Sequence, residues 1–80
     1  MTKINFPPPL TSREKDVADL ISQGETNYEI MEKLSITKHT LKAHIGSLYH
    51  KYGLTSLNTK EHAVKRLRFV LKYLSATKRI

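Results

Sequence analysis

Apolar side chains recur at helical spacing in four segments of this 80-residue chain, and strand-like alternation never continues for more than a few residues. The clearest pattern lies in the segment 37–53, where apolar positions at i, i+4, i+7 and i+11 share one helical face. Similar patterns predict helices over 11–24, over 26–34 and from about residue 60. The apolar residues of the four faces are, in chain order, Val17, Ala18, Leu20 and Ile21; Ile30, Met31 and Leu34; Leu41, Ile45, Leu48 and Tyr52; and Ala63, Val64, Leu67, Val70, Leu71 and Leu74. The sequence therefore predicts an all-α fold of four helices.

Threonines and glycines mark the boundaries of the first three helices. Thr11 and Thr26 are each followed three residues later by a glutamate, which is the spacing of a capping box. Thr37 is the expected N-cap of the third helix. Gly24 and Gly53 are the expected left-handed stops of the first and third helices. Only a serine and an isoleucine remain between the second and third helices, so that connection is expected to be tight.

The length and composition indicate one small soluble domain. We expect residues 10–75 to form this domain, residues 1–9 to be a proline-rich tail or linker, and residues 76–80 to fray. The chain has no cysteine, which excludes a disulfide framework and a cysteine-based zinc finger. It has neither a signal-peptide pattern nor an apolar run of about 20 residues, so no membrane is expected and a cytoplasmic location is favoured.

The net charge of +7 is unevenly distributed along the chain. Residues 1–34 contain four basic and six acidic side chains, whereas residues 35–80 contain ten basic side chains and one acidic side chain. Such a separation indicates a surface for a polyanion, and it favours nucleic acid as the partner. A solubilising face and a surface for anionic lipid are the alternatives.

The outer face of the predicted helix 37–53 is basic and has a low profile. It carries Lys38, Lys42 and Lys51 without any acidic residue, and the small residues Ala43 and Gly46 lie among them. Such a helix could be an ordinary solvated surface helix, or it could enter the major groove of DNA, which admits an α-helix between rows of phosphates. The short helix and tight connection before it favour the groove, because together the two helices form a helix-turn-helix.

In a helix-turn-helix, the N-terminal half of the second helix approaches the base edges. Lys42 is the main candidate for a base contact because a lysine can donate to O6 and N7 of guanine. Phosphates are expected near the start of helix 26–34, where backbone N–H groups and the helix dipole attract anions, and near the two ends of helix 37–53. The candidate phosphate contacts are Thr26, Asn27, Thr37, Lys38, His39 and Lys51.

Other functions fit the sequence less well. The four histidines are His39, His44, His50 and His62. Their spacing matches neither a metal-binding helix pair nor a zinc finger, so no metal or other cofactor is expected. The sequence shows neither a nucleophile–base pair nor a phosphate-binding glycine loop, so an enzyme is not expected. The remaining alternative is an interaction module, in which Arg66, Arg68 and Lys72 of the last helix help to bind a protein or an anionic membrane.

Several short motifs follow one another in a characteristic order between residues 10 and 72. A Leu-Thr-x-Arg-Glu motif opens the first helix, a glycine and Asn-x-Glu-Ile lead into the second, and Ile-Thr-x-x-Thr-Leu-Lys-x-His begins the third. The residues that carry these motifs, and the end of the third helix, are Leu10, Thr11, Arg13 and Glu14; Gly24, Asn27, Glu29 and Ile30; Ile36, Thr37, Thr40, Leu41, Lys42 and His44; and Lys51, Tyr52 and Gly53. Together they resemble the helix-turn-helix DNA-binding domain of LuxR/GerE-type bacterial transcription regulators.

The resemblance implies sequence-specific binding of double-stranded DNA and regulation of bacterial transcription, with two domains pairing as a homodimer. It implies base contacts from Lys42, Ala43 and Gly46, and phosphate contacts from the starts of the second and third helices. It also implies that the fourth helix pairs the two domains, and it makes RNA polymerase a candidate second partner. The residues expected at the dimer interface are Val64, Leu67, Leu71 and Leu74.

The chain departs from the family pattern at several positions. Met31 replaces a small residue of the second helix, and Ser47 stands where an asparagine is frequent. Gly46 stands where many members carry a longer contacting side chain, and the loop 55–60 is longer than usual and lacks a common arginine. The sensing or receiver domain that precedes the motif in most members is not in this sequence, which fits a stand-alone regulator and an excised domain equally well.

Overall fold

The computed structural model describes residues 8–54 and 62–76, and within these ranges the chain forms four α-helices and no strand. The helices are α1 (Ser12–Ser22), α2 (Asn27–Leu34), α3 (Lys38–Lys51) and α4 (His62–Ala76). The prediction of an all-α, four-helix fold is therefore confirmed. The predicted tails 1–9 and 76–80 lie outside the described residues except for Pro8, Pro9 and Ala76, and the loop 55–60 lies outside them entirely.

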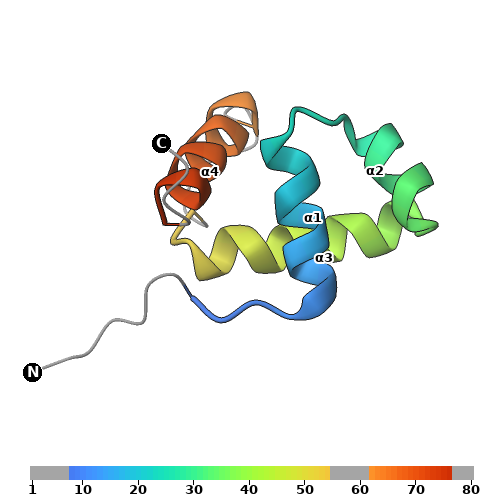
Figure 1. Ribbon diagram of the computed structural model, residues 1–80, viewed down its shortest axis with the longest axis horizontal. Coiled ribbons are helices and arrows are strands. Elements are labelled where there is room, and N and C mark those ends of the chain that lie inside the picture. Colours follow the sequence, from blue (N-terminus) through green and yellow to red (C-terminus); the bar gives the residue numbers. More distant parts are fainter. Residues whose placement is uncertain (1–7, 55–61, 77–80) are drawn as a thin grey trace, which may run out of the picture.

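The helices are arranged around α1, which packs against the other three. Figure 1 shows α1 crossing α3, with α2 beside the N-terminal end of α3 and α4 beside its C-terminal end. Because α2 and α3 are joined by only three residues, the two helices lie at an angle to each other at one end of the domain.

The predicted caps are present at the starts of the first three helices. The Thr11 hydroxyl accepts from the Glu14 N–H, and the Glu14 carboxylate accepts from the Thr11 N–H at 3.0 Å, which completes the box. Thr26 and Glu29 form the second box in the same way. Thr37 caps α3 by accepting from the N–H of Thr40. These side chains satisfy backbone donors that a helix leaves without partners at its N-terminus.

The same geometry ends α1, α2 and α3. In each, a residue with positive φ follows the last turn, and the N–H of the next residue donates to a carbonyl five positions back. The positive-φ residues are Gly24, Gly53 and, between α2 and α3, Ser35 with φ of 55°. The left-handed region costs an ordinary residue about 1 kcal/mol or more, so the helix-turn-helix connection is held in its tight form by the packing on either side of it.

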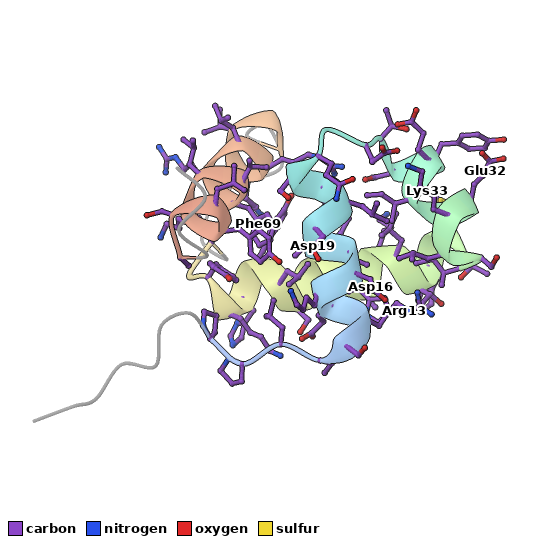
Figure 2. All side chains as sticks on the ribbon, viewed as in Figure 1. Arg13, Asp16, Asp19, Glu32, Lys33 and Phe69 are labelled. Carbon is purple, nitrogen blue, oxygen red and sulfur yellow. The ribbon has the colours of Figure 1, made fainter. Side chains whose placement is uncertain are left out.

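The core combines aliphatic residues of α1, α2 and α3 with aromatic residues contributed mainly by α4. Phe69 is fully buried, stacks on Tyr73, and receives the ring of Tyr52 edge-on at 5.1 Å between centroids. Figure 2 shows Phe69 directed from α4 toward α1 and α3. The buried apolar residues are Val17, Ala18, Ile21, Ile30, Leu41, Leu48, Tyr52, Leu54, Phe69 and Tyr73.

The apolar face predicted for the last helix is divided in the structure. Val70 and Leu74 pack against the core beside Phe69 and Tyr73, whereas Val64, Leu67 and Leu71 point outward and are 43%, 58% and 51% exposed. One edge of the predicted face therefore lies against the core and the other is open to solvent, while the most deeply buried residues of α4, Phe69 and Tyr73, were not in the predicted face. The large aromatic rings bury more apolar area than leucine or valine, and their burial sets the rotation of α4 about its axis. The side chain of Ala63 lies outside the described residues.

Candidate nucleic-acid interface

The outer side of α3 presents the three predicted base-contact residues to solvent. Lys42, Ala43 and Gly46 are all exposed, while Leu41 and Leu48 on the opposite side of the same helix are buried. Beyond the neighbouring backbone of its own helix, a Cβ atom placed on Gly46 would meet nothing within 4 Å, so the packing of the domain does not require a glycine there. The small residues therefore leave the backbone of α3 open to close approach from outside.

The start of α2 carries two of the predicted phosphate contacts, Thr26 and Asn27, and both are exposed. The predicted capping box satisfies the N–H groups of Thr26 and Glu29, so these two N–H groups are not free for a phosphate. Hydrogen bonds from the backbone and hydroxyl of Thr26 lower the pKa of the Glu29 carboxyl below its usual value. The N-terminus of α2 thus holds a carboxylate of its own.

The start of α3 carries three further predicted phosphate contacts, Thr37, Lys38 and His39. All three are exposed. The Thr37 hydroxyl accepts from the Thr40 N–H at 3.1 Å and donates to the Thr40 hydroxyl at 3.0 Å, so the cap of α3 is formed by side chains of α3 and its N-cap alone. Lys38 and His39 follow the cap directly and can reach outward from the first turn.

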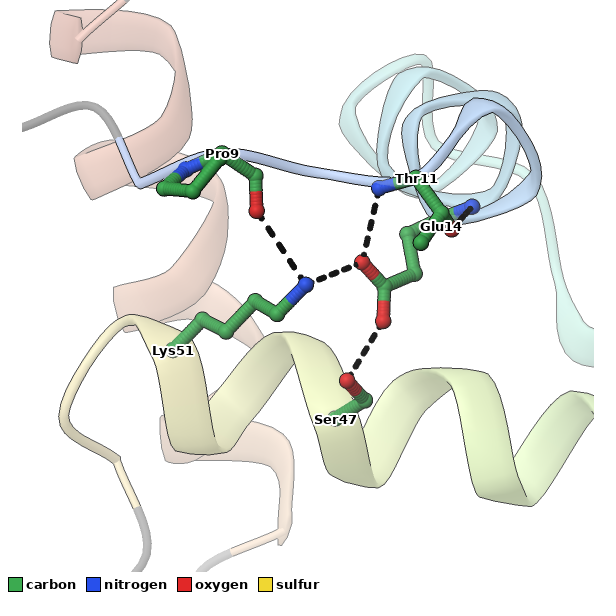
Figure 3. A network of polar contacts seen from close by, with 5 residues as sticks. All are labelled: Pro9, Thr11, Glu14, Ser47 and Lys51. Carbon is green, nitrogen blue, oxygen red and sulfur yellow. Dashed lines mark hydrogen bonds and ion pairs between the residues drawn. The ribbon is translucent and has the colours of Figure 1, made fainter.

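Lys51, the sixth predicted phosphate contact, points instead toward α1. Its ammonium donates to Oε1 of Glu14 at 2.6 Å and to the carbonyl of Pro9 at 3.1 Å. The second carboxylate oxygen of Glu14 accepts from the hydroxyl of Ser47. Figure 3 shows these groups meeting between the start of α1 and the C-terminal half of α3. Lys51 is therefore engaged within the domain, and we do not propose it as a phosphate contact.

Glu14 is the one buried charged residue among the described residues, with only 6% of its surface exposed. Burial by itself raises the pKa of this carboxyl, but the hydrogen bonds from Lys51, Ser47 and the Thr11 backbone outweigh burial and lower the pKa to about 2. The carboxylate is therefore charged at neutral pH and ties α1 to α3. Its role as a capping residue was visible in the sequence, but its contact with α3 was not, because no local spacing reports which helix α1 crosses.

An open cleft lies between α3, α4 and the start of α2. It has a volume of about 460 Å³ and includes two of the predicted base-contact residues. Arg66 donates to Oδ1 of Asn27 at 2.8 Å and to the carbonyl of Glu25 at 3.0 Å, which joins α4 to the start of α2. The residues that line the cleft are Asn27, Lys42, Ile45, Gly46, Tyr49, Lys65 and Arg66. Lys65 and Arg66 were not among the predicted nucleic-acid contacts, since their position in the sequence does not indicate that α4 lies beside α3.

The predicted dimer residues are mostly available on α4. Val64, Leu67 and Leu71 form one exposed stripe at helical spacing, while Leu74 is half-buried and packs against the core. Single exposed apolar residues are common on soluble proteins, but three on one helix face form a contiguous apolar strip. Two basic residues of the same helix make contacts within the domain, because Arg66 binds α2 and Lys72 donates to the carbonyl of Tyr52 at 3.3 Å.

No group of three or more potential metal ligands occurs among residues 8–54 and 62–76. Of the histidines, His39 and His50 are exposed and His44 is half-buried, while the side chain of His62 lies outside the described residues. None of the described helices is long and apolar enough to cross a membrane.

The fold and this surface define a helix-turn-helix domain in which α2 and α3 form the motif and α3 has a basic outer face. The sequence model of the family described as "Bacterial regulatory proteins, luxR family" matches residues 8–62. The chain therefore belongs to the luxR family of bacterial regulatory proteins, in which the helix-turn-helix binds DNA to regulate transcription. The predicted resemblance to LuxR/GerE-type domains is confirmed.

Curated relatives are similar to this chain over part of their length. The chain is 46% identical over 48 residues to the transcriptional regulatory protein MctR of Rhizobium johnstonii. This match covers 60% of the chain and 22% of MctR. It is 35% identical over 66 residues to the HTH-type transcriptional regulator MalT of Yersinia pestis, which covers 82% of the chain and 7% of MalT. The chain thus spans a small fraction of these relatives, and no solved structure is significantly similar to it.

Proposed function

We propose that this domain binds a specific double-stranded DNA sequence as a homodimer, with α3 in the major groove, and that it regulates transcription by doing so. The observation that carries the proposal is the outer face of α3, where an exposed lysine lies beside two small residues on a helix whose opposite face is buried through Leu41 and Leu48. The major groove admits a helix of this kind, and small side chains permit close approach to the base edges. The proposed base contacts are Lys42, Ala43 and Gly46.

The starts of α2 and α3 supply the proposed phosphate contacts. Exposed hydroxyl, amide and basic groups lie there next to helix N-termini, which favour anions. Such contacts set the orientation of a protein on the duplex and carry little sequence information. The proposed phosphate contacts are Thr26, Asn27, Thr37, Lys38 and His39. Because DNA is the partner, we expect the domain to act in the cytoplasm.

The exposed strip of α4 supports pairing of two domains. Pairing through Val64, Leu67 and Leu71 would place two α3 helices on half-sites related by a two-fold axis, as a symmetric dimer requires. Leu74 contributes from the edge of the strip, since it also packs inward. RNA polymerase is a proposed further partner that rests on family membership alone.

Selection of bound duplexes from a random DNA pool at about 150 mM salt tests the proposal, because nonspecific attraction is weakened at that ionic strength. We expect the wild-type protein to enrich an inverted repeat and Lys42→Ala to enrich none. Lys15→Ala, which removes the same charge from an exposed position of α1, is the matched control and is expected to behave as wild type. Retention of no DNA would overturn the proposal and favour an interaction module.

The homodimer has its own test in the stoichiometry of the complex. On a duplex with both half-sites, we expect sedimentation to report two protein molecules for the wild type. Leu67→Gln places a polar amide in the strip and is expected to leave one molecule per duplex at the same concentration, while binding to a single half-site is retained. Two molecules bound with unchanged cooperativity would exclude this strip as the dimer interface.

A further inference from the structure

The cleft between α3 and α4 is lined by three cationic side chains, Lys42, Lys65 and Arg66. None of the three forms an ion pair with a carboxylate among residues 8–54 and 62–76, and no acidic residue lines the cleft. Outside the cleft, Arg13, Lys15, Lys33 and Lys51 are each paired with an acid, whereas Lys38, Arg68 and Lys72 form no ion pair within the described ranges but lie apart from the cleft lining. The cleft is therefore a place where positive charge is gathered without being neutralised.

Two of these cations are held in position by neighbouring groups. The guanidinium of Arg66 uses two of its nitrogens to bind Asn27 and the Glu25 carbonyl, which fixes its plane at the edge of the cleft and leaves further N–H donors. The ammonium of Lys65 lies 5.5 Å from the centre of the Tyr49 ring, within the range of a cation–π contact. Such contacts reduce the freedom that these long side chains would lose on binding an anion.

The position of the cleft indicates which anion reaches it. Lys42 and Gly46 belong both to the lining of the cleft and to the proposed base-contact face of α3. A helix seated in the major groove has a row of backbone phosphates along each side. The cleft opens along one such side, next to the start of α2, so a duplex on α3 would bring a backbone phosphate to its mouth.

We propose that this cleft binds one backbone phosphate of the DNA, with Lys65 and Arg66 of α4 as its ligands. Lysine offers a compact charge and arginine a planar fork, and both are suited to phosphate oxygens. This inference rests on the proposed function and extends the interface to α4. It gives α4 two faces with separate roles, since the apolar strip of Val64, Leu67 and Leu71 does not line the cleft.

The salt dependence of binding to the selected duplex tests this proposal. Each phosphate contact adds about 0.9 to the slope of log affinity against log salt concentration. We expect Lys65→Gln, which keeps much of the stem over Tyr49 but leaves Arg66 in place, to reduce the slope by up to that amount and to weaken binding similarly on all sequences. Lys65→Arg is expected to restore the slope. Arg68→Gln, at an exposed position of α4 outside the cleft, is the matched control and is expected to retain it.

Single neutral methylphosphonate groups placed along the duplex locate the phosphate. We expect one position to weaken the wild type more than it weakens Lys65→Gln, because that variant has already lost one of the two cationic ligands of the phosphate. Equal slopes for Lys65→Gln and Arg68→Gln, or the absence of any coupled position, would overturn the phosphate cleft while leaving DNA binding intact. A wild-type protein that binds no duplex would overturn the proposed function as well, so the two failures are distinguishable.

Discussion

The two long sides of α3 place the same type of residue in opposite surroundings. On the side facing α1, Lys51 binds the buried carboxylate of Glu14 and a backbone carbonyl, and Ser47 completes the network. On the side facing the cleft, Lys42 is exposed and lies near Lys65 and Arg66 with no carboxylate among the lining residues. The first side joins two helices of the domain, and the second leaves its positive charge available to a partner.

The difference shows that net charge overstates the charge available for binding. Both lysines count equally toward the +7 of the chain, yet a lysine paired with a buried glutamate has little attraction left for a phosphate. We therefore expect substitutions on the α1 side to change the stability of the fold, and substitutions on the cleft side to change affinity for DNA.

The largest expected effect is that of Lys51→Ala on stability. Breaking a buried ion pair leaves an uncompensated charge and costs about 3–5 kcal/mol, and we expect the lower end because Lys51 is 29% exposed. Urea denaturation measures the free energy of unfolding. Lys15→Ala, whose ion pair with Asp19 spans 3.8 Å at the surface, is the control and is expected to change stability by less than about 0.5 kcal/mol. Equal losses in the two variants would remove the distinction between buried and surface pairs.

The next effect is a dependence of stability on pH that Glu14 causes. Because the pKa of Glu14 in the folded state is about 2, below its usual value, the charged carboxylate stabilises the fold above about pH 4.5. This contribution, of order 3 kcal/mol, is lost as the pH falls from about 4.5 to 2. Unfolding curves measured across that range are expected to converge for the wild type and Glu14→Gln toward the acidic end. A constant difference between the two proteins would contradict the shifted pKa.

A smaller effect, on affinity rather than stability, is expected for Lys42→Ala. Loss of a base contact by this residue would reduce affinity for the selected site by about 1–3 kcal/mol, while the free energy of unfolding changes by less than about 0.5 kcal/mol. Fluorescence anisotropy with the selected duplex and with one of unrelated sequence separates a base contact from a phosphate contact. An equal loss on both duplexes would assign Lys42 to the backbone.

The smallest effects are expected for Gly46→Ala, which should change stability and DNA affinity in opposite directions. Alanine is better than glycine in a helix by about 1 kcal/mol, and a Cβ at this position meets nothing within 4 Å beyond the neighbouring backbone of its own helix, so Gly46→Ala should stabilise the isolated domain. If the backbone of α3 approaches the bases closely here, the same methyl group should weaken binding to the selected duplex. Thermal unfolding and anisotropy on one preparation give both values. Unchanged or tighter binding would place the closest approach elsewhere on α3.

The local features of the fold could be predicted from the sequence because they depend on neighbours along the chain. Capping boxes at Thr11 and Thr26 are set by residues three positions apart, and the stops at Gly24 and Gly53 depend on the tolerance of glycine for positive φ. The buried face of α3 followed from the spacing of its apolar residues. The order of the motifs was sufficient to predict the family.

The contacts between distant residues were decided only by the tertiary structure. The pairing of Glu14 with Lys51, the joining of Arg66 to Asn27 and the rotation of α4 about Phe69 and Tyr73 all depend on how helices cross. Periodicity reports which residues share a face of a helix, but not what that face meets. Residues 37 or 39 positions apart carry no sequence signal for their contact. The sequence therefore predicted a basic helix, and only the fold distinguished Lys51, which is paired with Glu14, from Lys42, which lines the cleft.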